Sequence, residues 1–229
     1  MLDRPYTVLS CSVSLDGYLG DGSPRLALSN DADFDRVDAV RASCDAIMVG
    51  GVTVRADDPR LLVRSRTRRE ERAACGRPPS PMKVTVTERA DFDADSNFFA
   101  VGDSEKLVYT SSARVRDARA RLGPVATIVD GGRRVRMRRL SEDLADRGVE
   151  RLMVEGGGVV HTQFLADDLV DELQLVIAPL FIGDSKAPRF VGDGHFPWNP
   201  GQRATLAEVR PIGEVVLLRY ALSPRFRDG

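Results

Sequence analysis

Cysteine and histidine are scarce in this chain of 229 residues. The three cysteines, Cys11, Cys44 and Cys75, are widely spaced, and no Cys-x-x-Cys pair occurs. An odd set of this kind is not a disulfide framework, and it argues against a zinc site built from thiolates. Cys44 lies in an apolar run, where we expect a small core side chain. The two histidines, His161 and His195, stand alone and are expected to be structural or solvent-facing rather than metal ligands.

Long hydrophobic runs and an excess of charge are also lacking. Apolar stretches such as residues 170–182 are short and interrupted by charge, so we expect no segment that spans a bilayer. No secretory signal is visible at residues 1–5, and a cytoplasmic protein is expected. Lys and Arg number 33 against 34 Asp and Glu, which argues against a general nucleic-acid binder. A solvated face is therefore predicted for the arginine cluster of Arg133, Arg134, Arg136, Arg138 and Arg139.

A chain of 229 residues, 42% of them hydrophobic, is long enough to bury a full core without disulfides or metals. Short apolar runs alternate with helical patterns, and strands that are apolar throughout are typical of a sheet covered on both faces. Strands are predicted at residues 6–15, 45–50, 82–87, 106–110, 125–129, 151–154, 173–177, 207–209 and 214–220. Helices are predicted from residue 30 or 31 to 43, from 111 or 112 to 122, at 140–147 and from the glycines at 156–158 to 166.

This order of elements predicts an α/β protein with a mostly parallel central sheet, helices on both faces and an antiparallel edge. The antiparallel edge is expected because the last strands follow one another without helices between them. The polar segment SRTRREERAACGRPPSP, residues 65–81, is predicted to be a long surface loop within one domain rather than a linker between two.

Ligands of open parallel sheets bind at the carboxyl ends of the strands, so the segments that follow the strands are the candidate sites. Residues 14–17, Ser-Leu-Asp-Gly, read as a turn, and residues 177–184 show no chemistry by themselves. Residues 50–59 combine two glycines, which let a ligand approach the backbone, with the Thr53 hydroxyl and the carboxylates of Asp57 and Asp58. Residues 154–158 end a strand in Glu155 and open a helix with three glycines. Free amides at a helix start attract phosphate, so the residues alone predict a metal-free α/β protein with a phosphate-bearing ligand.

The same segments, in the same order, resemble the reductase family of riboflavin biosynthesis, which also forms the C-terminal half of a bifunctional deaminase-reductase. The matching motifs are SLDG at 14–17, AIMVG at 46–50, TV at 53–54, ADDPRL at 56–61, VEGGG at 154–158, LVDEL at 169–173 and IAP at 177–179. The resemblance covers residues 6–220, which predicts a single reductase domain over residues 1–229. It implies a dihydrofolate-reductase-like fold, a homodimer, and reduction of a phosphoribosylamino-pyrimidine by NADPH, with hydride transfer to C1′ of the sugar.

The resemblance also implies site residues, position by position. The NADPH-contacting positions are Gly50, Thr53, Asp57, Gly156, Gly157, Gly158, Val159 and Val160. The substrate-contacting positions are Ser29, Arg41, Leu61, Arg64 and Glu155. Two arginines suit a sugar phosphate because a guanidinium pairs bidentately with its oxygens. Either Asp57 or Glu155 is expected to hold and protonate the reacting group.

Two departures from the family pattern keep other functions open. Ser10 stands where many relatives have Lys, and Ala27-Leu28-Ser29 stands where many have Trp-Ile-Thr. These changes favour, as an alternative, a reductase of the same fold acting on a pterin, a folate or a secondary-metabolite pyrimidine. The second alternative is a non-catalytic nucleotide-binding protein, which the joint presence of the implied site residues argues against. The zinc signature of the deaminase, His-x-Glu with Pro-Cys-x-x-Cys, does not occur in this sequence.

Overall fold

A computed structural model describes residues 3–22 and 26–227 of the chain. It contains nine strands and seven helices within those residues. The strands are β1 (Tyr6–Ser14), β2 (Ala46–Gly50), β3 (Met82–Val86), β4 (Lys106–Thr110), β5 (Thr127–Asp130), β6 (Arg151–Gly156), β7 (Glu172–Ala178), β8 (Thr205–Ile212) and β9 (Val215–Ala221). The helices are α1 (Asp31–Ser43), α2 (Gly51–Asp57), α3 (Arg66–Ala74), α4 (Asn97–Ala100), α5 (Val115–Leu122), α6 (Met137–Asp146) and α7 (Gly158–Ala166).

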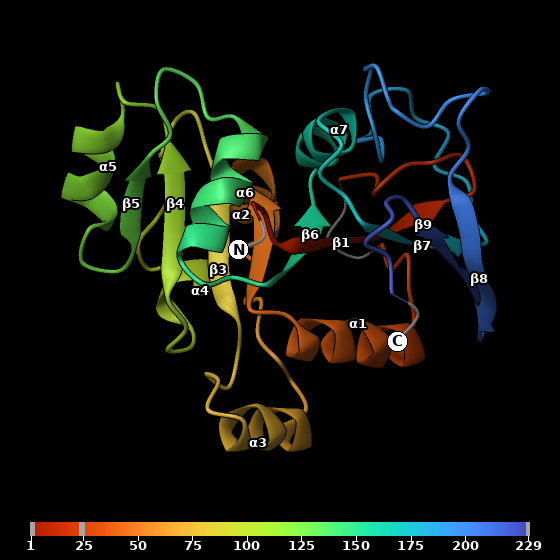
Figure 1. The fold of residues 1–229 in the computed structure, drawn as a ribbon, viewed down its shortest axis with the longest axis horizontal. Helices are drawn as coiled ribbons and strands as arrows, with labels where there is room; N and C mark the ends of the chain where they lie inside the picture. The colour runs from red at the N-terminus through yellow and green to blue at the C-terminus, as the bar shows by residue number, and fades with distance from the viewer. Residues whose placement is uncertain (1–2, 23–25, 228–229) are drawn as a thin grey trace. The chain divides into compact units, whose positions relative to one another are not determined.

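The strands follow the order β5-β4-β3-β2-β6-β1-β7-β9-β8, and the chain forms two compact units (Figure 1). The first unit comprises residues 1–5 and 38–153, and the second comprises residues 6–37 and 154–229. Strand β6 crosses the boundary, since its residues 151–153 belong to the first unit and 154–156 to the second. Helix α1 crosses it between Val37 and Asp38.

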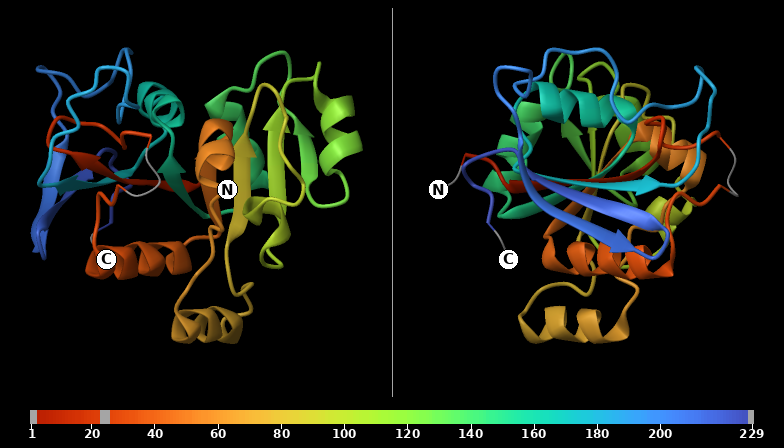
Figure 2. Two further views of the ribbon diagram at one scale, coloured as in Figure 1. Left: turned by 180° about the vertical axis from the view of Figure 1, so that it is seen from behind. Right: turned by 90° about the vertical axis from the view of Figure 1, so that its right-hand side faces the viewer.

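The first unit is a parallel sheet with helices on both faces. Strands β2, β3, β4 and β5 pair in parallel. Their middles are buried and apolar, as in the fully buried AIMVG strand β2. The connections from β2 to β3, from β3 to β4 and from β4 to β5 each step toward the β5 edge of the sheet. The connection through α6 leads in the opposite direction, from β5 to β6. Because parallel crossovers are right-handed, α6 lies on the face opposite α2, as Figures 1 and 2 show.

The second unit carries the antiparallel edge. Strand β1 pairs in parallel with β7, whereas β9 pairs antiparallel with β7 and with β8. One face of this edge is a closed core of Leu28, Val176, Ala178, Val215 and Leu217, with Ile212 beside them. The α/β class, the mostly parallel sheet, the helices and the antiparallel edge expected from the sequence are therefore confirmed.

The prediction for residues 65–81 is wrong, because residues 66–74 form the helix α3. The hydroxyl of Ser65 accepts a hydrogen bond from the amide of Arg68 at 3.4 Å and caps the helix start. Arg72 is buried, and its guanidinium donates to the carbonyls of Ala42, Cys44 and Pro78 at 2.7–2.8 Å. A polar helix is held here by one arginine rather than by an apolar face, so hydrophobic periodicity did not reveal it.

Cysteine, histidine and the unit boundaries were each the subject of a prediction. Cys44 is fully buried, as predicted for a core side chain. His161 is buried on α7, and His195 is exposed in the loop before β8. None of the helices in the described ranges has the length and apolar character needed to cross a membrane. The unit boundaries fall at residues 5, 37 and 153 rather than in the segment 65–81.

Candidate active site

The predicted site residues fall in both units, and the residues of each unit are described separately. In the first unit, β2 ends at Gly50, which is the N-cap residue of α2. A Cβ on Gly51 would lie 3.0 Å from the Thr87 Cβ and 3.1 Å from the Phe92 ring, so a larger residue would make tight contacts here. The helix that follows presents Thr53, half-buried, and ends in Asp57, which is exposed.

The carboxyl of Asp57 lies at the exposed end of α2. Desolvation by the surrounding protein raises the pKa of Asp57 above its usual value. A carboxyl with a raised pKa stays protonated to a higher pH and is therefore available as a proton donor, which fits the expected role.

The turn after α2 is shaped by Asp58. This residue adopts a left-handed conformation with φ of 41° and is the C-cap of the helix. Its carboxylate accepts hydrogen bonds from the Asn97 side chain at 2.7 Å and from the Phe98 amide at 3.3 Å. Although desolvation opposes it, these bonds lower the pKa of Asp58, so the two neighbouring carboxyls are shifted in opposite directions. Asp58 thus fixes the backbone, and Asp57 remains available for chemistry.

The structure brings together the three predicted substrate positions of the first unit. Leu61 is buried with a positive φ of 47°, and the chain runs from it along the end of α1. The Arg41 guanidinium donates to the carbonyl of Leu62 at 3.3 Å. The Arg64 amide donates to the carboxylate of Asp38, which lies one helical turn before Arg41. Both arginines therefore belong to one local constellation.

Asp38 is the residue of this constellation that the sequence analysis missed. Its carboxylate also accepts from the Ser65 amide at 3.1 Å and from the Arg68 guanidinium at 3.0 Å. Although burial opposes ionisation, the Arg64 and Ser65 amides and the Arg68 guanidinium lower the pKa of Asp38. The available signal was the spacing of Asp38 and Arg41, which places both side chains on one face of α1.

In the second unit, β6 delivers Glu155 and Gly156 to the start of α7. Glu155 is half-buried and Gly156 is buried. Gly157 is the N-cap residue with φ of 89°, a conformation that favours glycine. Val160 packs inward, whereas Val159 is 69% exposed and points its side chain to solvent.

The start of α7 is also enclosed by a segment that the sequence analysis did not assign. The amide of Phe190 donates to the carbonyl of Gly17, and the ring of Phe190 lies 5.5 Å from that of His161. A Cβ on Gly158 would lie 2.2 Å from the carbonyl oxygen of Arg189. Gly158 is thus required by a contact within the protein, in addition to any ligand that approaches the helix.

The SLDG motif anchors the beginning of the loop that leads to this segment. Asp16 accepts hydrogen bonds from the Ser14 hydroxyl at 2.6 Å, the Ile182 amide at 3.1 Å and the Gly183 amide at 2.8 Å. The Ser14 hydroxyl bond is the leading cause that lowers the pKa of Asp16 to about 2. The turn predicted from the sequence is present, and its acid is an anchor for residues 182–183.

Ser29 occupies a different environment in this unit. Its hydroxyl donates to the buried carboxylate of Asp33 in the first turn of α1. Asp33 also accepts from Arg36, which in turn donates to Gln174 on β7. The hydroxyl of Ser29 is therefore part of a polar network that joins α1 to the antiparallel edge.

The donor set suits a nicotinamide dinucleotide. Helix α7 begins at Gly157 and Gly158 without a side-chain cap or an acidic residue in its first turn. Backbone amides left in that way can bind a pyrophosphate. Taken by itself, α2 of the first unit offers a hydroxyl and a carboxyl of the kind that bind a ribose or an amide. The residues present therefore fit the cofactor that the resemblance implies.

Comparison with known proteins agrees with the motif order. The family model described as the RibD C-terminal domain matches residues 5–218. The chain is 35% identical to the 2,5-diamino-6-ribosylamino-4(3H)-pyrimidinone 5′-phosphate reductase of Archaeoglobus fulgidus, with 97% of this chain and 99% of the relative covered. It is 33% identical to the protein of the same name from Methanothermobacter thermautotrophicus, with 96% and 99% covered.

Solved structures share the fold. The pyrimidine reductase-like protein of Corynebacterium diphtheriae superposes with a TM-score of 0.82 at 22% identity, over 95% of this chain and 91% of the other. The family match spans both compact units. The chain therefore belongs to the RibD C-terminal domain family.

Proposed function

We propose that this protein is an NADPH-dependent pyrimidine reductase of riboflavin biosynthesis. Its substrate is 2,5-diamino-6-ribosylamino-4(3H)-pyrimidinone 5′-phosphate, and the product is the ribitylamino form. The observation that carries the proposal is the near full-length likeness to two archaeal reductases named for that substrate. The uracil counterpart is the second substrate to be tested, because the family also includes the longer RibD proteins.

The substrate phosphate is assigned to Arg41 and Arg64. Both arginines are held beside the same stretch of chain, one through the Leu62 carbonyl and the other through Asp38. The Arg64 side chain is 59% exposed and lies 3.9 Å from the Asp38 carboxylate, so it can turn toward an incoming anion. A guanidinium pairs bidentately with phosphate oxygens, so the two side chains can orient the sugar.

The cofactor positions are Gly50, Thr53 and Asp57 of the first unit and residues 156–160 of the second. When bound, NADPH supplies the hydride that reduces C1′ of the sugar. The amides at the start of α7 are assigned to the pyrophosphate, which they would hold in position for the reaction. The chain thus provides orientation and charge rather than the redox chemistry.

One carboxyl is expected to donate the proton that the reduction requires. Reduction at C1′ of an open-chain imine or aldehyde leaves a nitrogen or oxygen that needs a proton. Asp57 has the raised pKa that suits a donor, and Glu155 is the other candidate. The carboxyl that does not donate the proton would hold the substrate amine or hydroxyl.

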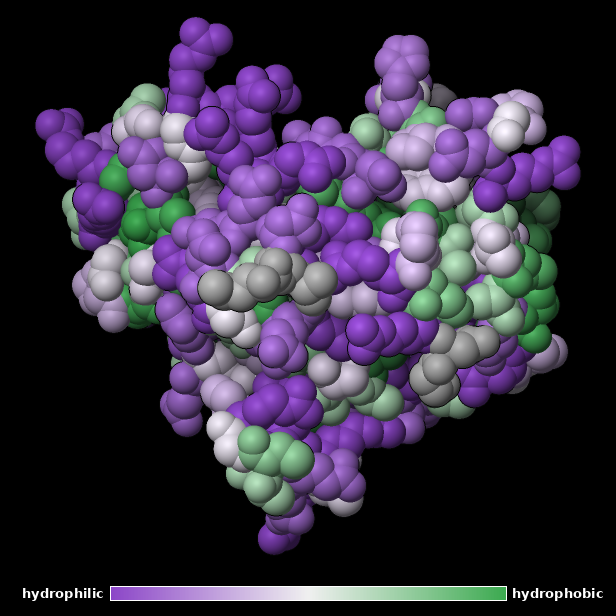
Figure 3. All heavy atoms as spheres, in the orientation of Figure 1, coloured by the Kyte–Doolittle hydropathy of each residue, from purple (hydrophilic) through white to green (hydrophobic). Residues whose placement is uncertain are grey.

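We also propose that the protein is a cytoplasmic homodimer. The support for the homodimer is one face of the antiparallel edge. On this face, the side chains of alternating residues of three strands remain partly or fully exposed. These residues are Leu173, Leu175 and Ile177 of β7, Val216, Leu218 and Tyr220 of β9, and Leu206, Val209 and Pro211 of β8. No helix lies in front of β8 and β9 in the right-hand view of Figure 2, and hydrophobic side chains gather at the edge where β8 lies in Figure 3. A self-complementary apolar sheet face of this kind suits a twofold dimer.

The proposal is tested with a substrate panel. Purified protein is mixed with NADPH and, in turn, the diamino substrate, its uracil counterpart, dihydrofolate and a dihydropterin, and loss of nicotinamide absorbance is followed. Turnover of the diamino phosphoriboside above all others is expected. Turnover of the folate or pterin alone would reject the proposed substrate, and NADPH binding without any turnover would indicate a non-catalytic binding protein.

A further inference from the structure

The chain reaches α3 through an extended segment, residues 62–65, which pairs with none of the strands that the structure describes. The segment follows Leu61 and carries Arg64, so it joins two of the positions assigned to the substrate. Figure 1 shows α3 at the end of this segment, away from the strands of the first unit. Backbone groups outside a sheet or helix must find side chains or water as partners. Those partners therefore decide how firmly Arg64 is placed.

Side chains take the place of a neighbouring strand along this segment. The amide of Val63 donates to the hydroxyl of the buried Ser80 at 3.0 Å. The Arg69 guanidinium, from α3, donates to the carbonyl of Val63 at 3.0 Å and to that of Arg64 at 2.6 Å. One arginine thus bridges two successive carbonyls of the chain that leads into its own helix. The bridge removes backbone freedom that an extended chain in water keeps.

Asp38 holds the amides of the same segment. One oxygen of its carboxylate accepts from the Arg64 amide, and the other accepts from the Ser65 amide at 3.1 Å. The Arg68 guanidinium donates to the carboxylate at 3.0 Å, and the Asp38 side chain is only 2% exposed. The backbone of Arg64 is therefore held from both sides, its N–H by Asp38 and its C=O by Arg69.

The charges of these residues favour an anion beside the segment. Arg69 donates only to neutral carbonyls and forms no ion pair with a carboxylate in the part of the chain that the structure describes, so its charge adds to that of Arg64. Asp38 lies 3.9 Å from the Arg64 guanidinium, and a carboxylate by itself repels a phosphate. Its presence is explained if the placement of Arg64 contributes more to phosphate binding than the repulsion removes.

We propose that Asp38 and Arg69 are positioning residues for the substrate phosphate, which they serve by fixing the backbone of Arg64 before the phosphate arrives. The inference rests on the proposed function, since it concerns an arginine assigned there. Ordering an extended segment during binding costs affinity, and a segment that is already ordered avoids that cost. Helix α3, which carries Arg69, thereby favours the phosphorylated substrate over its unphosphorylated form.

The test uses ribose 5-phosphate, the sugar phosphate of the proposed substrate, with ribose for comparison, titrated by calorimetry into the full-length protein. Asp38→Asn and Arg69→Met should each weaken ribose 5-phosphate binding about tenfold or more, because misplaced groups lose much of their binding energy. Arg66→Met is the matched control, since it removes the same charge from the same helix and its side chain is 85% exposed. The control should keep the wild-type affinity.

Asp38→Asn separates placement from charge, because the two effects have opposite signs. Loss of a negative charge by itself would strengthen phosphate binding. An amide side chain has one acceptor oxygen, so it cannot serve the Arg64 and Ser65 amides together, and positioning predicts weaker binding. In the reduction assay the same variants should raise KM for the phosphorylated substrate about tenfold and leave kcat within about threefold.

Wild-type or tighter binding of ribose 5-phosphate by Asp38→Asn, or wild-type binding by Arg69→Met, would overturn the inference. A wild type that binds ribose 5-phosphate no more tightly than ribose would also overturn it. In each of these cases, turnover of the diamino phosphoriboside by the wild type still decides the proposed function independently. Thermal unfolding of each variant separates loss of binding from loss of fold, and Arg69→Met decides alone if Asp38→Asn does not fold.

Discussion

A β-carbon on Gly158 would lie 2.2 Å from the carbonyl oxygen of Arg189, so the start of α7 and the segment before β8 are in direct backbone contact. No rotamer change relieves a clash between a β-carbon and a main-chain carbonyl. Gly158→Ala is therefore expected to lower the free energy of unfolding by about 2 kcal/mol and the melting temperature by roughly 5 °C. It should also weaken NADPH binding, because it displaces the amides of Gly157 and Gly158.

The control is Gly192→Ala in the same segment. A Cβ there meets only the Thr162 hydroxyl at 3.7 Å, which is an ordinary contact. Differential scanning calorimetry of both variants checks the prediction. A Gly158→Ala protein as stable as Gly192→Ala would show that the segment shifts freely and does not constrain α7.

Arg72 is expected to be the anchor of α3. Truncation in Arg72→Ala leaves the carbonyls of Ala42 and Cys44 without their buried donor, which should cost about 2–4 kcal/mol of unfolding free energy. Arg66→Ala removes only an exposed pair with Glu70 and should cost less than about 0.5 kcal/mol. Urea unfolding measures both. A similar small loss in the two variants would mean that α3 is held by other contacts.

The anchoring of α3 by Arg72 also shows which features can be predicted from the sequence and which cannot. The strand β4 is predicted with its observed bounds, and α1 is predicted from residue 30 or 31 to 43 and observed over 31–43, because capping residues and apolar runs are local signals. The anchoring of α3 by Arg72 was missed, since its partners Ala42 and Cys44 are about thirty positions away and are backbone carbonyls. Every residue has a backbone carbonyl, so the residue types at these positions do not indicate the contact.

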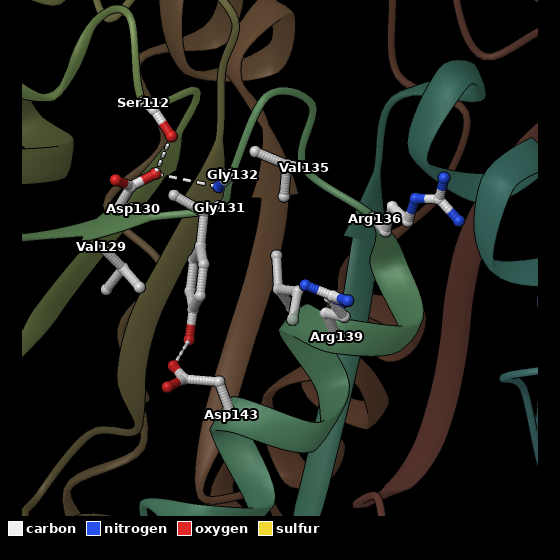
Figure 4. A pocket seen from close by; sticks show the side chains of 11 residues that line it. Ser112, Val129, Asp130, Gly131, Gly132, Val135, Arg136, Arg139 and Asp143 are labelled. Carbon is white, nitrogen blue, oxygen red and sulfur yellow. Dashed lines mark hydrogen bonds between the residues drawn. The ribbon is translucent and has the colours of Figure 1, made fainter.

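The same distinction between local signals and contacts made in the folded chain applies to the candidate site. Motif order predicts site residues on α2, at residues 154–158 and at the two arginines, Arg41 and Arg64. It did not locate Asp38, whose role depends on where Arg64 and Ser65 place their amides after the chain has folded. It predicted a solvated face for Arg136 and Arg139, and the cavity between β4, β5 and α6 that they line (Figure 4) exists only in three dimensions.

His161 is expected to make the protein sensitive to acid. Its ring is fully buried, and burial lowers the pKa of His161 from 6.5 to about 4. Between those values the unfolded chain binds a proton that the folded protein does not. The free energy of unfolding should therefore be fully present above pH 6.5 and fall by up to about 3 kcal/mol as the pH drops to 4.

His161→Gln isolates this contribution from the carboxylates that also titrate. Glutamine can still donate to the Phe190 carbonyl, which lies 3.2 Å from Nδ1 of His161, but it does not ionise. Chemical unfolding at a series of pH values should give the variant a shallower slope over that window. Parallel slopes for the two proteins would rule out His161 as the source of acid sensitivity.

Asp57 and Glu155 are expected to differ in their effects on turnover. If Asp57 is the proton donor, Asp57→Asn should lower kcat about 100-fold or more, and wild-type kcat should fall as the pH rises through the raised pKa of Asp57. Glu155→Gln should then raise KM more than it lowers kcat. Asp117→Asn on the exposed face of α5 serves as the control. Near wild-type kcat in both site variants would remove both carboxyls from the chemistry.

The apolar face of the antiparallel edge should control the oligomeric state. Leu206 and Val209 are 51% and 55% exposed on β8, next to the side chains of Tyr220 and Leu218 on β9. Leu206→Glu with Val209→Glu places two charges into this face, and burying them unpaired at a twofold interface is strongly unfavourable. Sedimentation should show a dimer for the wild type and a 25.1 kDa species for the double variant. Thr205→Glu, on the opposite face of the same strand, should remain dimeric, and a wild type that sediments only as the 25.1 kDa species would reject the proposed homodimer.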